Sequence, residues 1–262
     1  MRIYSLSLCM IAGIQAAAPK LCGVAEQGGI LFGESDTHNV YFNNKRVSNN
    51  GVFTIGLAMD APEKVSIKFC KKGIFGACQT FEYSVGLRKY PEQHVTVPER
   101  FVTWPDDIAK RIAQENDAIR AARDVLSDGV FFMEARPPLP LEAHRITSVY
   151  GARRVFNGQP RRPHNGIDFA GEIGTKFTTI APGTVVLVGD FYLTGKTVFV
   201  DHGNRIISAY FHMDEIKVEV GNEVLYNTVL GTVGNTGRSS GPHLHLGIYW
   251  HQIALDPAFF IK

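Results

Sequence analysis

The sequence predicts a mainly β protein with a small N-terminal antiparallel β-sandwich, one amphipathic connecting helix and a C-terminal antiparallel β-sheet domain. In both halves, short runs of β-branched and aromatic residues alternate with Gly, Asn and Pro turn residues. One stretch between them has apolar residues at the spacing of an amphipathic helix. With 262 residues, 45% of them hydrophobic, the chain is long enough for two modest domains.

Residues 1–18 are predicted to be a secretory signal peptide. Arg2 gives the charged start, residues 3–14 a mostly apolar run, and residues 16–18 a small-residue cleavage site. An uncleaved anchor is the alternative, but the run is shorter than the about 20 apolar residues that span a bilayer. No second apolar run approaches that length. We therefore expect an exported mature chain without a transmembrane segment, located in the periplasm or outside the cell.

Export changes how the cysteines are interpreted, because disulfides form and persist in oxidising compartments. Cys70 and Cys78 flank a turn-like segment between two strand-like runs, so we predict a disulfide between them. Cys22 is then the odd cysteine of the mature chain, and its fate is left open.

The charge balance gives no support to binding of nucleic acid or of a membrane surface through a polybasic segment. Lys and Arg number 27 against 25 Asp and Glu, and no basic run is longer than Arg161-Arg162. We therefore expect no nucleic-acid partner.

The N-terminal β-domain is placed at residues 19–99. Its expected strands lie at residues 29–33, 40–42, 52–56, 65–69 and 80–83. Asn43-Asn44 and Asn50-Gly51 suit hairpin turns because both pairs tolerate positive φ. The region contains no cluster of His, Asp and Glu that resembles a catalytic or metal site. We therefore expect this domain to serve in binding, as a spacer or as a cover.

The connecting helix and linker are placed at residues 100–136. A helix is expected over residues 105–126, with Thr103 as its N-cap and Leu126 as the last residue of its apolar face. The prolines of residues 136–140 cannot continue a helix, so they are expected to form an extended linker at the domain boundary.

Residues 137–262 form the second predicted domain, where every chemically interesting grouping lies. Its expected strands lie at residues 185–188, 197–200, 205–210, 218–220, 229–233 and 244–250. On the last strand the side-chain period of two places His243 and His245 on the same face. From the tripeptide His243-Leu244-His245 alone, a metal-binding pair of histidines and a pair of polar residues on a solvated strand face are equally good interpretations.

His164 and Asp168 favour the metal interpretation. Gly166 is expected to let the backbone turn tightly between them, so that both can reach one ion. A catalytic zinc takes three protein ligands and keeps a fourth position for water. His164, Asp168 and one histidine of the pair supply that number.

His212 is a further candidate, at the end of an expected strand. With His243 it could flank the bound water, one imidazole taking a proton and the other stabilising an oxyanion. For His212 alone, a structural histidine near a strand end remains the alternative.

Several sequence motifs together indicate a family resemblance. Two of them are the segments His164 to Asp168 and His243 to His245. The others are Val149-Tyr150-Gly151-Ala152-Arg153, Ile180-Ala181-Pro182-Gly183-Thr184, Asp201-His202-Gly203 and Thr236-Gly237-Arg238-Ser239-Ser240-Gly241-Pro242. Together, over residues 146–257, they resemble the lysostaphin/LytM-type zinc metallopeptidases. The resemblance implies one Zn²⁺ held by His164, Asp168 and His245, with His212 and His243 as catalytic residues. Phe211 departs from the small residue that is more usual in this family, which could narrow the cleft.

The resemblance also implies a function, namely hydrolysis of the peptide cross-links of bacterial peptidoglycan. D,D-endopeptidase activity on stem peptides is expected, with carboxypeptidase activity as a further option. Arg153, Ser239 and Ser240 are the candidate substrate-binding residues of the cleft. The first half is similar to the β-sandwich extension of some exported Gram-negative members.

One alternative follows from the same resemblance. Members with degenerate sites are non-enzymatic activators of cell-wall amidases, but here all five site positions are filled.

A separate hypothesis concerns the N-terminal domain. The combination of a β-domain without chemistry of its own, a bracing helix and a proline linker suggests an autoinhibitory contact in which this domain covers the cleft.

Overall fold

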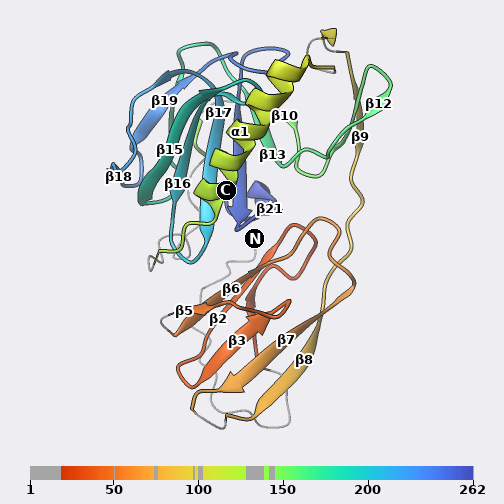
Figure 1. The fold of residues 1–262 in the computed structure, drawn as a ribbon, viewed down its shortest axis with the longest axis vertical. Helices are drawn as coiled ribbons and strands as arrows, with labels where there is room; N and C mark the ends of the chain where they lie inside the picture. The colour runs from red at the N-terminus through yellow and green to blue at the C-terminus, as the bar shows by residue number, and fades with distance from the viewer. Residues whose placement is uncertain are drawn as a thin grey trace. The chain divides into compact units, whose positions relative to one another are not determined.

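The computed structural model describes residues 19–49, 51–73, 76–96, 98–99, 103–127, 139–141 and 145–261. These residues are mainly β, with a single α-helix among them, and the chain divides into two compact units, Met1–Arg88 and Lys89–Lys262 (Figure 1). The expected signal peptide at residues 1–18 and most of the expected proline linker lie outside the described residues.

The first unit is the predicted antiparallel β-sandwich. One four-stranded sheet has the order β1 (Cys22–Gly23), β2 (Ile30–Glu34), β6 (Val52–Gly56), β5 (Ser48–Asn49). The other has the order β4 (Lys45–Arg46), β3 (His38–Phe42), β7 (Lys64–Lys71), β8 (Cys78–Ser84). Phe53 of β6 and Phe69 of β7 meet edge to face, with ring centroids 5.9 Å apart, so the core lies between the sheets.

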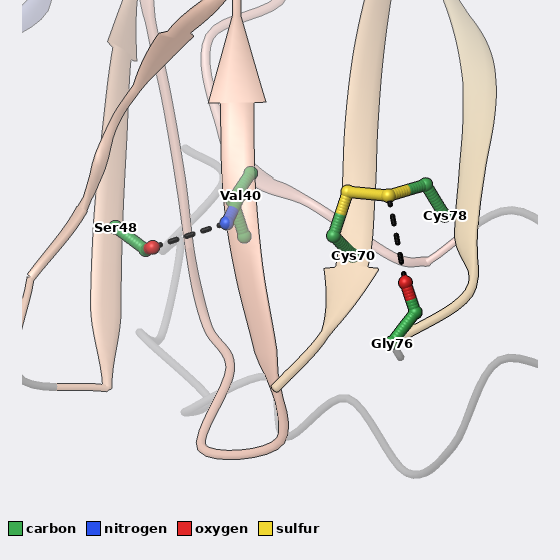
Figure 2. Close-up of a disulfide and its surroundings, with 5 residues drawn as sticks. All are labelled: Val40, Ser48, Cys70, Gly76 and Cys78. Atoms are coloured by element: carbon green, nitrogen blue, oxygen red, sulfur yellow. Dashed lines mark hydrogen bonds between the residues drawn. A yellow bond between two sulfur atoms is a disulfide. The ribbon is translucent and has the colours of Figure 1, made fainter. Parts of the chain in front are cut away.

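Two further links hold this sandwich together (Figure 2). Cys70 and Cys78 are cross-strand partners on β7 and β8 and form a disulfide. The backbone N–H of Val40 donates to the Ser48 hydroxyl at 3.0 Å, which joins β3 of one sheet to β5 of the other. Closing so short a loop by a disulfide stabilises a fold by about 2–3 kcal/mol through the entropy of the unfolded chain.

The second unit is built on a ten-stranded antiparallel sheet. Its main path has the order β10 (Arg145–Ser148), β13 (Gly166–Ala170), β20 (His243–Trp250), β17 (Ile206–Ile216), β16 (Gly195–Asp201), β15 (Gly183–Phe191), β18 (Glu223–Val224). The strands β14 (Lys176–Thr178), β19 (Val229–Val233) and β21 (Ile253–Leu255) pair alongside, and a short 3₁₀ helix, Pro257–Phe259, follows. The central strands β17 and β20 are almost entirely buried, so this pair forms the core of the unit.

A smaller sheet of the same unit has the order β12 (Gln159–Pro160), β11 (Arg153–Phe156), β9 (Glu92–Val95). β9 runs parallel to β11, whereas β11 and β12 form an antiparallel hairpin. Residues 218–220, expected as a strand, are instead a connection that turns at Gly221, where φ is +91°. The backbone hydrogen bond from Asn222 N to Glu219 O closes that turn.

The helix α1 (Asp106–Arg123) belongs to the second unit. Ile119 packs in one cluster with Phe199 and Tyr249, and the Arg123 guanidinium lies 3.9 Å from the Tyr249 ring centroid. Gln252 donates to the carbonyl of Arg120. No helix within the described ranges is long and apolar enough to cross a membrane.

The predicted helix ends were wrong by a few residues. Pro105 is the N-cap and makes no side-chain cap, while the Thr103 hydroxyl donates to Glu99 instead. The helix ends at Arg123, so Leu126 lies beyond its last turn and is 52% exposed.

A buried polar network ties β17 to the connections around β15 and β16. The Tyr210 hydroxyl accepts the backbone N–H of Ile180 at 2.9 Å and lies 3.1 Å from the Ser208 hydroxyl. Ser208 in turn bonds His202 Nε2 at 2.7 Å, and His202 Nδ1 donates to the carbonyl of Pro182 at 2.7 Å. Burial lowers the pKa of His202 and raises the pKa of Tyr210. His202 is therefore a neutral, structural histidine.

Replacing Tyr210 with phenylalanine tests this network. Tyr210→Phe removes the acceptor of the buried Ile180 N–H, and a buried unsatisfied donor costs about 1–3 kcal/mol. We expect the free energy of unfolding to fall by that amount in chemical denaturation, with little change in the m-value. An unchanged free energy of unfolding would show that the network contributes nothing.

Candidate metal and catalytic site

The antiparallel pairing of β13 with β20 brings the site together, because Asp168 is the direct cross-strand partner of His245. His164 lies just before β13. Three atoms converge: His245 Nδ1 is 2.8 Å and His164 Nε2 is 3.0 Å from Asp168 Oδ1, and the two nitrogens are 2.9 Å apart. All three side chains are buried.

His164 is oriented by polar groups behind it. Its Nδ1 lies 3.0 Å from the carbonyl oxygen of Val149 and 2.9 Å from the Ser148 hydroxyl. Ser148 also donates to Gln93 Oε1, at 2.9 Å. Donation from Nδ1 to the Val149 carbonyl fixes the tautomer and leaves the Nε2 lone pair directed at the site.

His245 is oriented by packing. The Phe211 ring stacks on the imidazole with a centroid distance of 4.8 Å and an interplanar angle of 2°. On Gly166, a Cβ would lie 2.8 Å from the His245 ring and 2.2 Å from the Leu246 carbonyl oxygen. Gly166 is thus a strand residue that makes room for the imidazole. The expectation that it forms a tight turn between His164 and Asp168 was wrong.

Arg154 binds the second oxygen of the Asp168 carboxylate. Its Nη2 donates to Asp168 Oδ2 at 2.9 Å, which leaves Oδ1 facing the two histidines. The predicted cleft residue Arg153 is exposed and lies outside the cleft lining, because neighbouring residues of β11 point to opposite sides.

The electrostatics suit a metal ion. Burial raises the pKa of Asp168, but the close side-chain contacts with His164 and His245 outweigh it, so that the pKa lies well below the usual range. Burial lowers the pKa of His245 to about 4 and also lowers the pKa of His164. Two neutral imidazoles and one carboxylate form a donor set that fits a divalent transition metal. Within the described part of the chain, it is the one such group of three.

His212 and His243 stand beside this donor set, with ring centroids 4.7 Å apart. His212 Nδ1 donates to the carbonyl of Thr236 at 2.8 Å, and His243 Nδ1 donates to that of Gly241 at 2.8 Å. His212 has a φ of +63°, a strained value for a non-glycine residue, which its backbone N–H bond to Thr194 O helps to hold. Because Nδ1 makes the backbone hydrogen bond in both residues, the Nε2 atoms of His212 and His243 remain available for proton transfer. Burial, followed by His243, lowers the pKa of His212 to about 3.

These four histidines open onto one cleft with a volume of about 1550 Å³. Ser239 and Ser240 line it, and the Ser239 hydroxyl lies 3.2 Å from His243 Nδ1. The structure thus brings the predicted ligands, the predicted catalytic histidines and both serines together, and leaves Arg153 outside. Substrate binding by the two serines stays a prediction.

Sequence reasoning missed Ser148, Arg154 and the stacking role of Phe211. Arg154 directly follows the motif that ends at Arg153, and the alternation of side chains along a strand was the signal that could have separated the two arginines. No local pattern marks Ser148, because its partners Gln93 and His164 are distant in sequence.

A sheet that presents two histidines and an aspartate to one point, with two further oriented histidines beside them, is typical of metal-dependent hydrolases. Comparison with known proteins finds a family that is similar over this region. Residues 162–257 of the second unit match the model of Peptidase family M23.

Two named relatives are similar to part of the chain. The peptidoglycan DD-endopeptidase ShyA of Vibrio cholerae is 41% identical over 102 residues, which are 38% of this chain and 24% of ShyA. The DD-carboxypeptidase/endopeptidase Mpg of Neisseria meningitidis is 38% identical over 106 residues, which are 40% of this chain and 24% of Mpg. The match therefore spans about a quarter of the length of these relatives.

A solved structure matches more of the chain. A Pseudomonas aeruginosa protein assigned to peptidase M23 has a TM-score of 0.70 and 28% identity, covering 90% of this chain and 95% of that one. The likeness extends over both units.

Substitution of Gly166 tests the orientation of His245. In Gly166→Ala the new methyl group collides with the imidazole, so we expect affinity for added Zn²⁺ to fall at least about 10-fold in a chelator competition assay. Gly241→Ala is the matched control, because a Cβ there meets nothing within 4 Å and affinity should be retained. Equal affinities of both variants would contradict this account of Gly166.

The buried histidines predict a pH dependence for the metal-free protein. Below pH 6.5 the unfolded chain binds protons that His212 and His245 do not bind until about pH 3 and about pH 4. The free energy of unfolding should therefore decrease as the pH falls from 6.5 to 4.5, by up to about 1.4 kcal/mol per pH unit for each histidine. Urea unfolding at several pH values measures this, and a flat profile would contradict it. The depressed pKa of Asp168 adds its own loss only at lower pH.

Proposed function

We propose that the chain is an exported zinc metallopeptidase that hydrolyses peptide cross-links of bacterial peptidoglycan. The main support for this proposal is that all five expected site residues are brought together. His164, Asp168 and His245 converge on one point. His212 and His243 are oriented beside them. The names of ShyA and Mpg support a D,D-endopeptidase, with carboxypeptidase activity as a second reaction of the same cleft.

In this proposal His164 Nε2, His245 Nδ1 and Asp168 Oδ1 would hold one Zn²⁺. Bound there, zinc supplies a Lewis acid that polarises the scissile carbonyl and lowers the pKa of water. His212 and His243 move the protons, because their Nδ1 atoms are bonded to backbone carbonyls and their Nε2 atoms are not. One of these imidazoles takes a proton from the attacking water at Nε2, and the imidazolium so formed stabilises the oxyanion and passes that proton to the leaving amine.

Export to the periplasm or the cell exterior is part of the proposal. It is supported by the signal-peptide pattern of residues 1–18 and by the Cys70–Cys78 disulfide, since such bonds persist in oxidising compartments.

The alternative is a non-enzymatic activator of cell-wall amidases with the same fold. We favour the enzyme because both imidazoles expected to move protons are present and oriented. The idea that the N-terminal β-domain covers the cleft remains a prediction from the sequence.

Two alanine substitutions separate metal binding from proton transfer. His245→Ala should lose bound zinc and cleavage of purified sacculi, because a ligand is gone. His243→Ala should keep zinc and lose about 10²–10⁴-fold in cleavage rate, the usual contribution of a general acid or base. Metal content is measured by elemental analysis and cleavage by mass spectrometry of released muropeptides.

His251 lies outside the cleft lining and offers a control, since His251→Asn, which suits the positive φ of that residue, should change neither readout. Full metal content and activity in His245→Ala would show that the ligand assignment is wrong. A wild-type protein that holds zinc but releases no product from sacculi would favour the amidase activator.

A further inference from the structure

We propose that Arg161 and Arg238 form a carboxylate-binding subsite beside the catalytic histidines, which makes the cleft select peptides with free carboxylates near the scissile bond. This inference rests on the proposed function, because it specifies the substrate chemistry of that same cleft.

The first observation is the charge of the cleft lining. Among the described residues, it contains seven arginines against two carboxylates, Glu115 and Asp168. The arginines are Arg120, Arg123, Arg145, Arg154, Arg161, Arg162 and Arg238. Both carboxylates are already engaged, Asp168 by Arg154 and Glu115 by Arg111. The lining therefore presents an excess of positive charge, although the chain as a whole is nearly neutral.

The second observation is that two of these arginines are held in place next to the site. Arg161 donates its backbone N–H to the Arg154 carbonyl and its Nη2 to Gln159 Oε1, at 2.8 and 2.7 Å. The Arg238 guanidinium lies 5.3 Å from the Phe156 ring centroid, and the backbone N–H of Arg238 donates to the carbonyl oxygen of Leu193. Side chains held in this way lose less entropy when they bind a ligand.

The third observation is the closeness of these groups to the chemistry. Arg238 directly precedes Ser239, whose hydroxyl contacts His243, and Arg154 contacts the ligand Asp168. A carboxylate bound between Arg161 and Arg238 would thus belong to the segment of peptide that the histidines act on. This position makes it a specificity element for the reaction.

Electrostatics explain why an anion would bind there. Burial first, and then the charges of Arg154 and Arg161, lower the pKa of Arg238 to about 10, so it is still a cation at neutral pH. Arg161 and Arg238 carry like charges that repel each other, and a carboxylate bound between them would relieve that repulsion. Arginine also matches carboxylate geometry, because its planar guanidinium offers two parallel donors.

The test uses two labelled cross-linked stem peptides, one with free side carboxylates and the other with these carboxylates amidated. Binding to the zinc-loaded full chain is measured by fluorescence anisotropy in a His243→Ala background, which suppresses cleavage. We expect the free form to bind about 10- to 100-fold more tightly, the effect of charge-assisted hydrogen bonds. Arg161→Gln and Arg238→Gln should each move that ratio towards one.

Arg153→Gln is the matched control, because Arg153 is exposed and lies outside the lining, and the ratio should be retained. Equal binding of the two peptides by the parent chain, or an unchanged ratio in both glutamine variants, would overturn the proposal. If Arg238→Gln loses its thermal unfolding transition, the ratio in Arg161→Gln decides by the same criterion.

Cleavage of the same peptides by the unsubstituted chain separates this inference from the proposed function. If neither peptide is cut, the proposed function fails while the binding ratio still decides the subsite. If both are cut, the free form should have the higher kcat/KM, mainly through KM, and equal values would count against the subsite.

Discussion

The antiparallel register of β13 with β20 is the constraint on which the site depends. It places Asp168 opposite His245, and a slip of one residue would turn one of these side chains to the other face of the sheet. The next pairing, β17 with β20, sets Phe211 opposite His245 and so supplies the ring that stacks on the imidazole. Two strand registers therefore fix a ligand, its carboxylate partner and its packing support.

The helix α1 is part of this arrangement. Ile119 shares a packed cluster with Phe211, which in turn supports His245. Glu115 accepts the backbone N–H of Tyr192, two residues before Thr194, whose carbonyl holds the strained backbone of His212. A chain shortened to begin at Leu139 would lose this support, so a loss of activity there would say nothing about a covering role of the first unit. A chain beginning at Lys89 keeps the compact unit whole.

Much of the fold and of the site was predictable because both depend on patterns among residues that are close in the sequence. β-rich runs separated by turn residues predicted most strands, and the side-chain period of a strand put His243 and His245 on one face. The support of the site was not predictable, because it depends on which distant surfaces meet. The register of β17 decides that Phe211, which lines the cleft, stacks on His245. The pairing of β13 with β20 leaves no room for a side chain at position 166, which explains the glycine there.

Four histidines at or near the site share one orientation of the imidazole, and His245 differs from them. His164, His202, His212 and His243 each direct Nδ1 at a backbone carbonyl, which fixes the tautomer and frees Nε2. His245 instead turns Nδ1 to the site, and its buried Nε2 has no hydrogen-bond partner among the described residues. The stack on Phe211 and the contact of Nδ1 with Asp168 Oδ1 at 2.8 Å hold the imidazole in this orientation. The strand registers therefore decide which nitrogen of His245 faces the site, whereas backbone carbonyls decide it for the other four histidines.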